Sequence, residues 1–165
     1  MFRKEKKIDL TWNDLNENIN MSSRTAPSPM YSVEAFVGDR SGSMHAMGDA
    51  PAEGTRKFIT ERRQFALDND VNGHFICTTF DSDATVVFNK LIKKITDKDI
   101  QNTVEQMRPR DLTRLIDTVY ETIESMIQRI HDYKKSLSPE AIALDPEIKA
   151  ICAILTDGED NESER

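Results

Sequence analysis

The run Tyr31-Ser32-Val33-Glu34-Ala35-Phe36-Val37 is followed, after one glycine, by Asp39-Arg40-Ser41-Gly42-Ser43. The first stretch predicts a buried strand, and the second places one carboxylate and two hydroxyls where that strand ends. Alternation along an extended loop puts residues 39, 41 and 43 on one side, and Gly42 allows a tight turn between them. Magnesium and manganese prefer near-octahedral oxygen ligands and often keep several waters. The stretch therefore predicts a divalent-cation site built from Asp39, Ser41 and Ser43.

Two segments further along the chain carry the same kinds of oxygen. Thr113 opens a long amphipathic helix, and Asp157 follows a second apolar run, Ile148 to Thr156. If the two apolar runs are neighbouring parallel strands, their carboxyl ends lie at one edge of a sheet, where ligands bind in doubly wound proteins. We therefore expect Thr113 and Asp157 to join the three residues after the first strand as ligands of one ion.

Between these segments, strand patterns alternate with helix patterns. Strands are expected at residues 31–37, 74–80, 85–91 and 148–156, and helices after Asp49-Ala50-Pro51, from Thr96 to Met107 and after Thr113, with a loop at 136–147. The turn Asp81-Ser82-Asp83 is too short for a parallel crossover, so it predicts an antiparallel hairpin whose second strand is an edge. The pattern predicts an α/β fold: a doubly wound, mostly parallel sheet with helices on both faces and one antiparallel edge strand.

The helix after Thr113 has the clearest periodicity in the chain. Its apolar residues recur every three or four positions: Leu115, Ile116, Val119, Tyr120, Ile123, Met126, Ile127 and Ile130. The opposite side carries Arg114, Asp117, Glu121 and Glu124. Such a stripe normally faces the core, so we expect it to cover the sheet. In the helix after Pro51, we expect Phe58, Ile59, Phe65 and Ala66 to share one face.

Taken together, the Asp-x-Ser-x-Ser stretch, Thr113 and the segment Thr156-Asp157-Gly158 resemble the von Willebrand factor type A domain and its metal-ion-dependent adhesion site. The resemblance spans residues 31–165 and matches three separated segments in the correct order. It implies that Ser41, Ser43 and Thr113 ligate Mg²⁺ or Mn²⁺. It also implies that Asp39 and Asp157 act directly or through water, and that an Asp or Glu of a partner protein completes the coordination shell.

The resemblance thus implies a protein-binding module, such as an adaptor within an assembly, rather than an enzyme. Two features depart from the family. Asp111-Leu112 precedes Thr113 where glycine is more usual, and the chain ends 165 − 157 = 8 residues after Asp157, whereas the family continues with further strands. We therefore expect the strand at 148–156 to be an uncovered apolar edge. The hypotheses are that a separate polypeptide or a second copy of the chain completes the sheet, or that the chain is a truncated product.

Composition fits one small domain. The 165 residues are 38% hydrophobic and 31% charged, enough for a single core. Residues 1–29 are expected to form a flexible polar arm, and residues 30–165 the domain. Alternation of Ile8, Leu10 and Trp12 leaves a short strand or docking peptide as the alternative for the arm.

Charge and hydropathy exclude other classes. A formal net charge of −7 argues against nucleic acid as a partner. No apolar stretch approaches the roughly 18–20 residues that span a bilayer, and the first residues lack the apolar core of a signal peptide. We expect a cytoplasmic protein without a membrane partner.

Cys77 and Cys152 both fall inside expected strands. In the sheet order that the resemblance implies, those strands flank the first one, so the two cysteines lie about 9–10 Å apart. A disulfide needs Cα atoms within about 7 Å. We expect two free thiols buried in the core.

Two other functions fit parts of the pattern. A phosphohydrolase of the haloacid dehalogenase type also places an aspartate after its first strand, here Asp39, but it has a second acid two positions on, where this chain has Ser41. A structural subunit with a lost metal site is the other alternative. His45 follows the first motif, but no nucleophile is identifiable beside it for general-base chemistry.

Overall fold

The computed structural model describes residues 30–110, 112–158 and 163. The predicted arm at residues 1–29 lies outside the described residues. The elements are β1 (Met30–Asp39), the 3₁₀ helix η2 (Gly42–Met47), α2 (Ala50–Asp68), β2 (Asn72–Phe80), β3 (Ala84–Leu91), the 3₁₀ turn η3 (Ile92–Lys94), α3 (Asp97–Gln106), α4 (Leu115–Ser136), α5 (Pro139–Ala143) and β4 (Glu147–Leu155).

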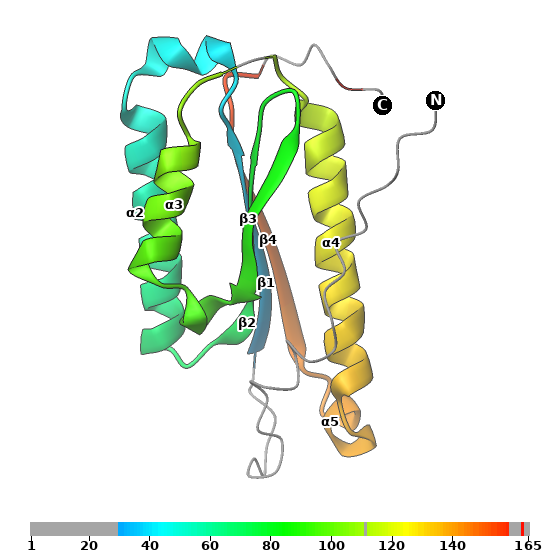
Figure 1. Ribbon diagram of the computed structural model, residues 1–165. Coiled ribbons are helices and arrows are strands. Elements are labelled where there is room, and N and C mark those ends of the chain that lie inside the picture. The colour runs from blue at the N-terminus through cyan, green and yellow to red at the C-terminus, as the bar shows by residue number, and fades with distance from the viewer. Residues whose placement is uncertain (1–29, 111, 159–162, 164–165) are drawn as a thin grey trace.

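The described strands form one sheet in the order β3-β2-β1-β4. β1 pairs in parallel with both β2 and β4, and β3 pairs antiparallel with β2 at the edge. Figure 1 shows α2 and α3 on one face of the sheet and α4 on the other. The predicted fold class is confirmed, including the antiparallel edge strand and helices on both faces.

The central strand β1 is buried from Tyr31 to Asp39. Its even-numbered residues face α2 and α3, where Phe36, Phe75 and Ile59 belong to one core cluster. On the α4 side, Val33 and Ala35 join a second, smaller cluster in which Tyr31 stacks on Tyr133 with ring centroids 3.7 Å apart. A strand between two covered faces needs apolar residues at nearly every position, as the sequence of β1 indicates.

The predictions of helix starts, of the buried face of α2 and of the loop at 136–147 are only partly confirmed. The capping box at the start of α3 is present, because Thr96 and Asp99 exchange side-chain and backbone hydrogen bonds. Asp49 precedes α2 as expected, yet its side chain makes no capping hydrogen bond. On α2, Ile59 is buried but Phe65 is exposed, so the predicted face is only partly covered. The connection at 136–147 is not all loop, since it contains α5.

The predicted apolar face of α4 is right only for Met126 and Ile130, which pack against the core on this side of the sheet. The residues that α4 buries are Asp117, Thr118, Thr122, Met126, Arg129 and Tyr133. Four members of the apolar stripe are instead 42–49% exposed: Ile116, Tyr120, Ile123 and Ile127. The helix is anchored at its start, where Arg114 N–H donates to the Asp81 carbonyl after β2. That anchor holds α4 over β1 and β2, so most of the exposed stripe lies beside β4 instead of over the centre of the sheet.

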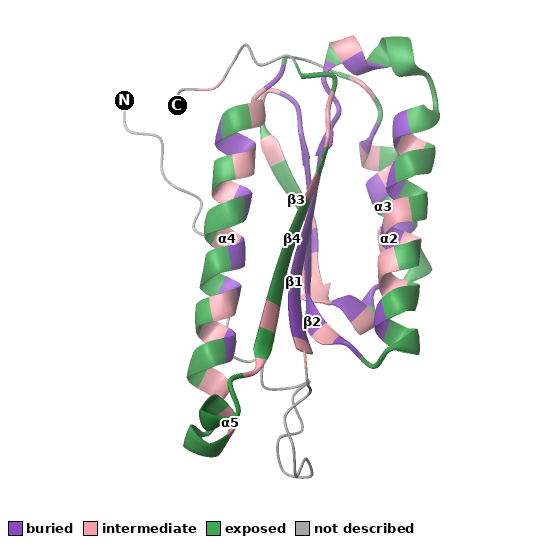
Figure 2. Cartoon of the chain, turned by 180° about the vertical axis from the view of Figure 1, so that it is seen from behind, coloured by how far each residue is buried: buried purple, intermediate pink, exposed green. Residues whose placement is uncertain are grey.

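The two cysteines are free, as predicted, but only Cys77 is buried. Burial raises the pKa of the Cys77 thiol to about 12. Cys152 is exposed because β4 is the last strand of the described sheet, and most of β4 is exposed or half-buried, as Figure 2 shows. The prediction that Cys152 lies in the core is therefore wrong, whereas the expected edge position of its strand is confirmed.

A buried histidine lies between the sheet and α4. His74 is 2% exposed, and its Nδ1 lies 3.1 Å from the hydroxyl of Tyr31. Burial, with a smaller effect of the Arg129 charge, lowers the pKa of His74 from 6.5 to about 3. The folded protein therefore keeps this imidazole neutral at pH values where the unfolded chain protonates it.

This difference gives His74 a measurable effect on acid stability. Between pH 6.5 and about pH 3, the unfolded chain binds the extra proton, so the free energy of unfolding falls as pH is lowered, by at most about 1.4 kcal/mol per pH unit from this group. We expect His74→Asn, which keeps an acceptor for Tyr31, to flatten the pH dependence in urea titrations between pH 4 and 6.5. The exposed His131, given the same substitution, serves as control, and equal slopes for parent and His74→Asn would contradict the assignment.

A buried ion pair joins the other face of β1 to α2. The side chain of Glu34 is fully buried in the middle of β1, and Arg62 donates to its two oxygens at 2.7 Å each. The Ser32 hydroxyl donates to the same carboxylate at 2.9 Å. A carboxylate so far from water is retained only because these donors satisfy it.

Removing the guanidinium group of Arg62 should leave Glu34 as an uncompensated buried charge. We expect Arg62→Met to lower the free energy of unfolding by roughly 3–5 kcal/mol at pH 7. The neighbouring Arg63 pairs with Asp97, whose side chain is 90% exposed, so Arg63→Met should cost less than about 1 kcal/mol. Chemical denaturation of both variants tests this, and similar losses for the two would count against a special role for the buried pair.

Candidate metal site

The carboxyl ends of β1, β2 and β4 lie at one edge of the sheet, the upper edge in Figure 1. At this edge Asp39 is paired with Phe80 of β2, and Gly38 with Leu155 of β4. The segments after β1 and β4 therefore start side by side although more than a hundred residues separate them in sequence. The fold brings Asp39 and the residues around Asp157 to the same edge, as predicted.

The carboxylate of Asp39 is held by hydrogen bonds from two segments. Asp39 is 0% exposed, and its Oδ1 accepts from the backbone N–H of Ser41 at 2.8 Å. Its Oδ2 accepts from the hydroxyl of Thr156 at 2.7 Å, which joins the end of β1 to the residue after β4. These contacts fix the orientation of the carboxylate.

The hydroxyls of Ser41 and Ser43 lie together in the loop that follows Asp39. Their Oγ atoms are 3.0 Å apart, and Ser41 is buried while Ser43 is half-buried. The expected extended loop over residues 39–43 is not formed, because a 3₁₀ helix begins at Gly42, directly after the extended residue Ser41. The left-handed conformation here belongs to Gly48, with φ 57°, and not to Gly42. A turn of 3₁₀ helix brings the two hydroxyls together.

Thr113 lies two residues before α4 rather than at its first turn, and it is 1% exposed. Backbone hydrogen bonds on both sides of it tie this loop to the site edge. Arg110 N–H donates to the Arg40 carbonyl at 2.7 Å, and Arg114 N–H donates to the Asp81 carbonyl at 3.0 Å. The loop that carries Thr113 is therefore attached to both the segment after β1 and the turn after β2.

Arg40 points away from the candidate ligands and anchors their loop. It is 4% exposed, and its Nε lies 2.9 Å from a carboxylate oxygen of Asp81. Its guanidinium also donates to Gln106 at 2.7 Å and to Thr85 at 3.1 Å. One side chain thus ties the loop after β1 to β3 and α3. The ion pair with Asp81 also gives that residue a structural role in the hairpin turn.

Asp157 is exposed and directly follows Thr156 at the end of β4. The turn is shaped by Gly158, whose φ of 90° is unfavourable for other residues, and whose N–H donates to the Thr156 hydroxyl at 3.0 Å. The acidic residues 159, 160 and 162 lie outside the described residues.

The site therefore offers few acidic groups and several hydroxyls. Among the described residues, no group of three or more His, Cys, Asp or Glu side chains lies close enough together to hold a metal ion. In the described part of the chain, the oxygens that could serve an ion at this edge are those of serine and threonine together with Asp39 and Asp157. Such a hard-oxygen set fits Mg²⁺ or Mn²⁺ better than zinc or copper, which favour nitrogen and sulfur.

Two contacts at this edge of the sheet were not predicted from the sequence. Thr156 was assigned only to the end of an apolar run, and the Arg40–Asp81 pair was not foreseen. A threonine directly before Asp157 was a usable signal for the first, since a hydroxyl at a strand end can bond to the neighbouring strand. Nothing in the sequence pairs Arg40 with Asp81, because their contact depends on the register of β1 against β2.

The Thr156 hydroxyl donates to a buried charge, so its loss should be costly. We expect Thr156→Val to lower the free energy of unfolding by roughly 1.5–3 kcal/mol in a chelator-containing buffer. Thr156→Ser keeps the donor and should lose less than half as much. Urea titrations of the three proteins measure this difference, and equal losses in the two variants would show that the methyl group rather than the hydroxyl matters.

No protein-family model and no curated protein matches this sequence. Within the described part of the chain, no helix has the length and apolar character needed to cross a membrane.

Proposed function

We propose that this edge binds Mg²⁺ or Mn²⁺ through oxygens of the five predicted ligands, and that the bound ion holds a carboxylate of a partner protein. The five residues are Asp39, Ser41, Ser43, Thr113 and Asp157. The observation that carries the proposal is the meeting of the Ser41 and Ser43 hydroxyls, 3.0 Å apart, in the loop whose Ser41 backbone N–H donates to the buried carboxylate of Asp39. The proposed role is that of a cation-dependent protein-binding module.

The state of Asp39 supports binding of a hard cation. Its carboxylate is fixed by the Ser41 N–H and the Thr156 hydroxyl, so it can direct lone pairs to an ion without first being ordered. Each carboxylate oxygen has a second lone pair beyond the one used in its hydrogen bond. A preorganised ligand loses little entropy on binding.

The small number of charges at the site supports the proposed binding of a partner's carboxylate by the ion. Asp39 and Asp157 together carry two negative charges, which neutralise a divalent ion, while hydroxyls add none. A magnesium-class ion with six positions would keep at least one for water or an outside oxygen. The exposed position of Asp157 leaves this side open to a partner. The resemblance to the type A domain points to the same chemistry, an Asp or Glu from the partner.

Metal binding can be tested through stability. A ligand that binds only the folded state raises the free energy of unfolding by ~2.7 kcal/mol at one hundred times its Kd. For a chain of this size that corresponds to a rise of roughly 5–10 °C in Tm. We expect this rise when chelator is replaced by millimolar Mg²⁺ or Mn²⁺, measured by circular dichroism. It should disappear in Asp39→Asn and in Ser41→Ala/Ser43→Ala.

The matched control is Asp83→Asn. Asp83 is an exposed acid in the turn after β2, at the same edge of the sheet, so its loss reports on general electrostatic attraction of cations. This variant should keep the full rise in Tm. A parent protein whose Tm is indifferent to both ions, or a rise that Asp83→Asn abolishes equally, would overturn the proposed site.

The carboxylate-binding step needs its own measurement. Water proton relaxation by bound Mn²⁺ depends on the inner-shell waters, so acetate that replaces one should lower the relaxation enhancement. We expect this with parent protein and a much weaker effect with formamide, its uncharged analogue. An unchanged enhancement would contradict the partner role. Magnesium-dependent turnover of p-nitrophenyl phosphate, lost in Asp39→Asn, would favour the phosphohydrolase alternative instead.

A further inference from the structure

Thr156 directly follows β4, at the edge of the sheet that holds the candidate ligands, and its hydroxyl makes two hydrogen bonds. It donates to Oδ2 of Asp39 at 2.7 Å and accepts from the backbone N–H of Gly158 at 3.0 Å. A hydroxyl has a single proton to donate, so the contact with Asp39 uses its whole donor capacity. One oxygen atom therefore joins the carboxylate after β1 to the turn after β4.

The second hydrogen bond acts on Asp157, because Thr156 and Gly158 are its two neighbours in the chain. The bond from the Gly158 N–H to the Thr156 hydroxyl closes a turn around Asp157, and the φ of 90° at Gly158 allows that turn. Two of the five proposed ligands are acids. The Thr156 hydroxyl orients one of them, Asp39, directly, and it shapes the backbone that carries the other.

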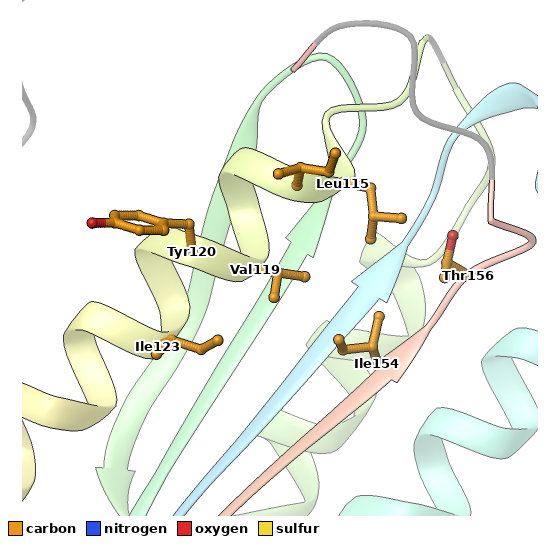
Figure 3. Close-up of a pocket in the computed structure, with 7 residues that line it drawn as sticks. Leu115, Val119, Tyr120, Ile123, Ile154 and Thr156 are labelled. Carbon is orange, nitrogen blue, oxygen red and sulfur yellow. The ribbon is translucent and has the colours of Figure 1, made fainter. Parts of the chain in front are cut away.

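The surroundings of the hydroxyl strengthen its hydrogen bond to Asp39. An apolar groove of about 550 Å³ runs between α4 and β4, lined by side chains of both elements that include Leu115, Ile123 and Ile154, and by Thr156. Figure 3 shows Thr156 past Ile154 at the end of β4, across from Leu115. Thr156 is half-buried and Asp39 is buried. A hydrogen bond to a charged group is strong in such a setting, so it holds the carboxylate firmly.

The two oxygens of Asp39 are held from different sides. Oδ1 accepts from the Ser41 N–H in the loop after β1, and Oδ2 accepts from Thr156 after β4. Turning the carboxylate about its Cβ–Cγ bond, so that both oxygens face one ion, would break one of these hydrogen bonds. Mg²⁺ requires a near-ideal octahedron at about 2.0–2.1 Å, whereas Ca²⁺ accepts roughly six to eight oxygens at about 2.3–2.6 Å, often two from one carboxylate.

We propose that Thr156 is a positioning residue that makes the site selective for Mg²⁺ over Ca²⁺, because it holds Asp39 as a one-oxygen ligand and fixes the turn that carries Asp157. This inference rests on the cation site proposed above. Without the Thr156 hydroxyl, Oδ2 of Asp39 loses its donor, and the carboxylate is free to turn and offer both oxygens to a larger ion. Loss of the hydroxyl therefore weakens the binding of Mg²⁺ more than that of Ca²⁺.

Competition against Mn²⁺ measures both ions in one assay, because free Mn²⁺ gives an electron paramagnetic resonance signal that bound Mn²⁺ loses. Thr156→Val keeps the shape of the side chain and removes the hydroxyl. We expect this variant to bind Mg²⁺ about tenfold more weakly and Ca²⁺ less than about threefold more weakly, since removing a group that orients a metal ligand commonly has effects of this size. Thr156→Ser keeps the hydroxyl and should keep the ratio of the two dissociation constants.

Two further variants separate positioning from a loss of stability. Thr103→Val removes a buried hydroxyl that donates to the Asp99 carbonyl within α3, so it should lower stability and leave the ratio of the two dissociation constants unchanged. Thr156→Ala also lacks the hydroxyl and should show the same change in the ratio as Thr156→Val. It replaces the valine variant if that variant does not unfold cooperatively.

The outcomes distinguish this inference from the function on which it rests. A parent protein that binds no Mn²⁺ overturns both. A parent that binds Mn²⁺, with the same ratio in the parent and in the variants without the Thr156 hydroxyl, overturns the role of Thr156 and leaves the cation site standing. A ratio that changes as much in Thr156→Ser or in Thr103→Val as in Thr156→Val would also overturn that role, because the hydroxyl would then not be the cause.

Discussion

The burial of β1 on both faces is the constraint on which the rest of the structure depends. Nine consecutive residues, Tyr31 to Asp39, are buried, and a strand lies on each side. A polar group in such a strand must be satisfied by the protein, because water cannot reach it. The carboxylate of Glu34 is paired with Arg62, and that of Asp39 accepts hydrogen bonds from Ser41 and Thr156.

At the carboxyl end of β1 the same demand organises four segments. The Asp39 carboxylate accepts a hydrogen bond from the Thr156 hydroxyl after β4. The Arg40 guanidinium pairs with Asp81 and donates to Gln106, and the Arg40 carbonyl accepts from the N–H of Arg110. The candidate ligands are thus held by residues that are not ligands themselves. A cation site with this support would be rigid before the ion arrives, which favours selectivity for small ions that require strict geometry.

The placement of α4 is the other consequence of the burial of β1 on both faces. Its start is fixed to the turn after β2, and its threonines allow close packing on β1 and β2, while a threonine hydroxyl such as that of Thr118 bonds back to the preceding turn. The more apolar side of the helix is therefore left beside β4. The groove is a product of this placement, since a helix shifted toward β4 would have covered Ile154 with the same residues.

The sequence by itself determined the four strands, the three longer helices, their order and the chemical types at the candidate site, but not the short helices η2 and α5. The periodicity of each segment, the short Asp81-Ser82-Asp83 turn and the Thr96 capping box are local properties, and local geometry decides them. Only the tertiary structure decided which face of α4 is buried, that Cys152 is exposed, and that Thr156 holds Asp39. Periodicity fixes the angles between residues within one helix, but the position of that helix on the sheet depends on contacts between segments far apart in the chain.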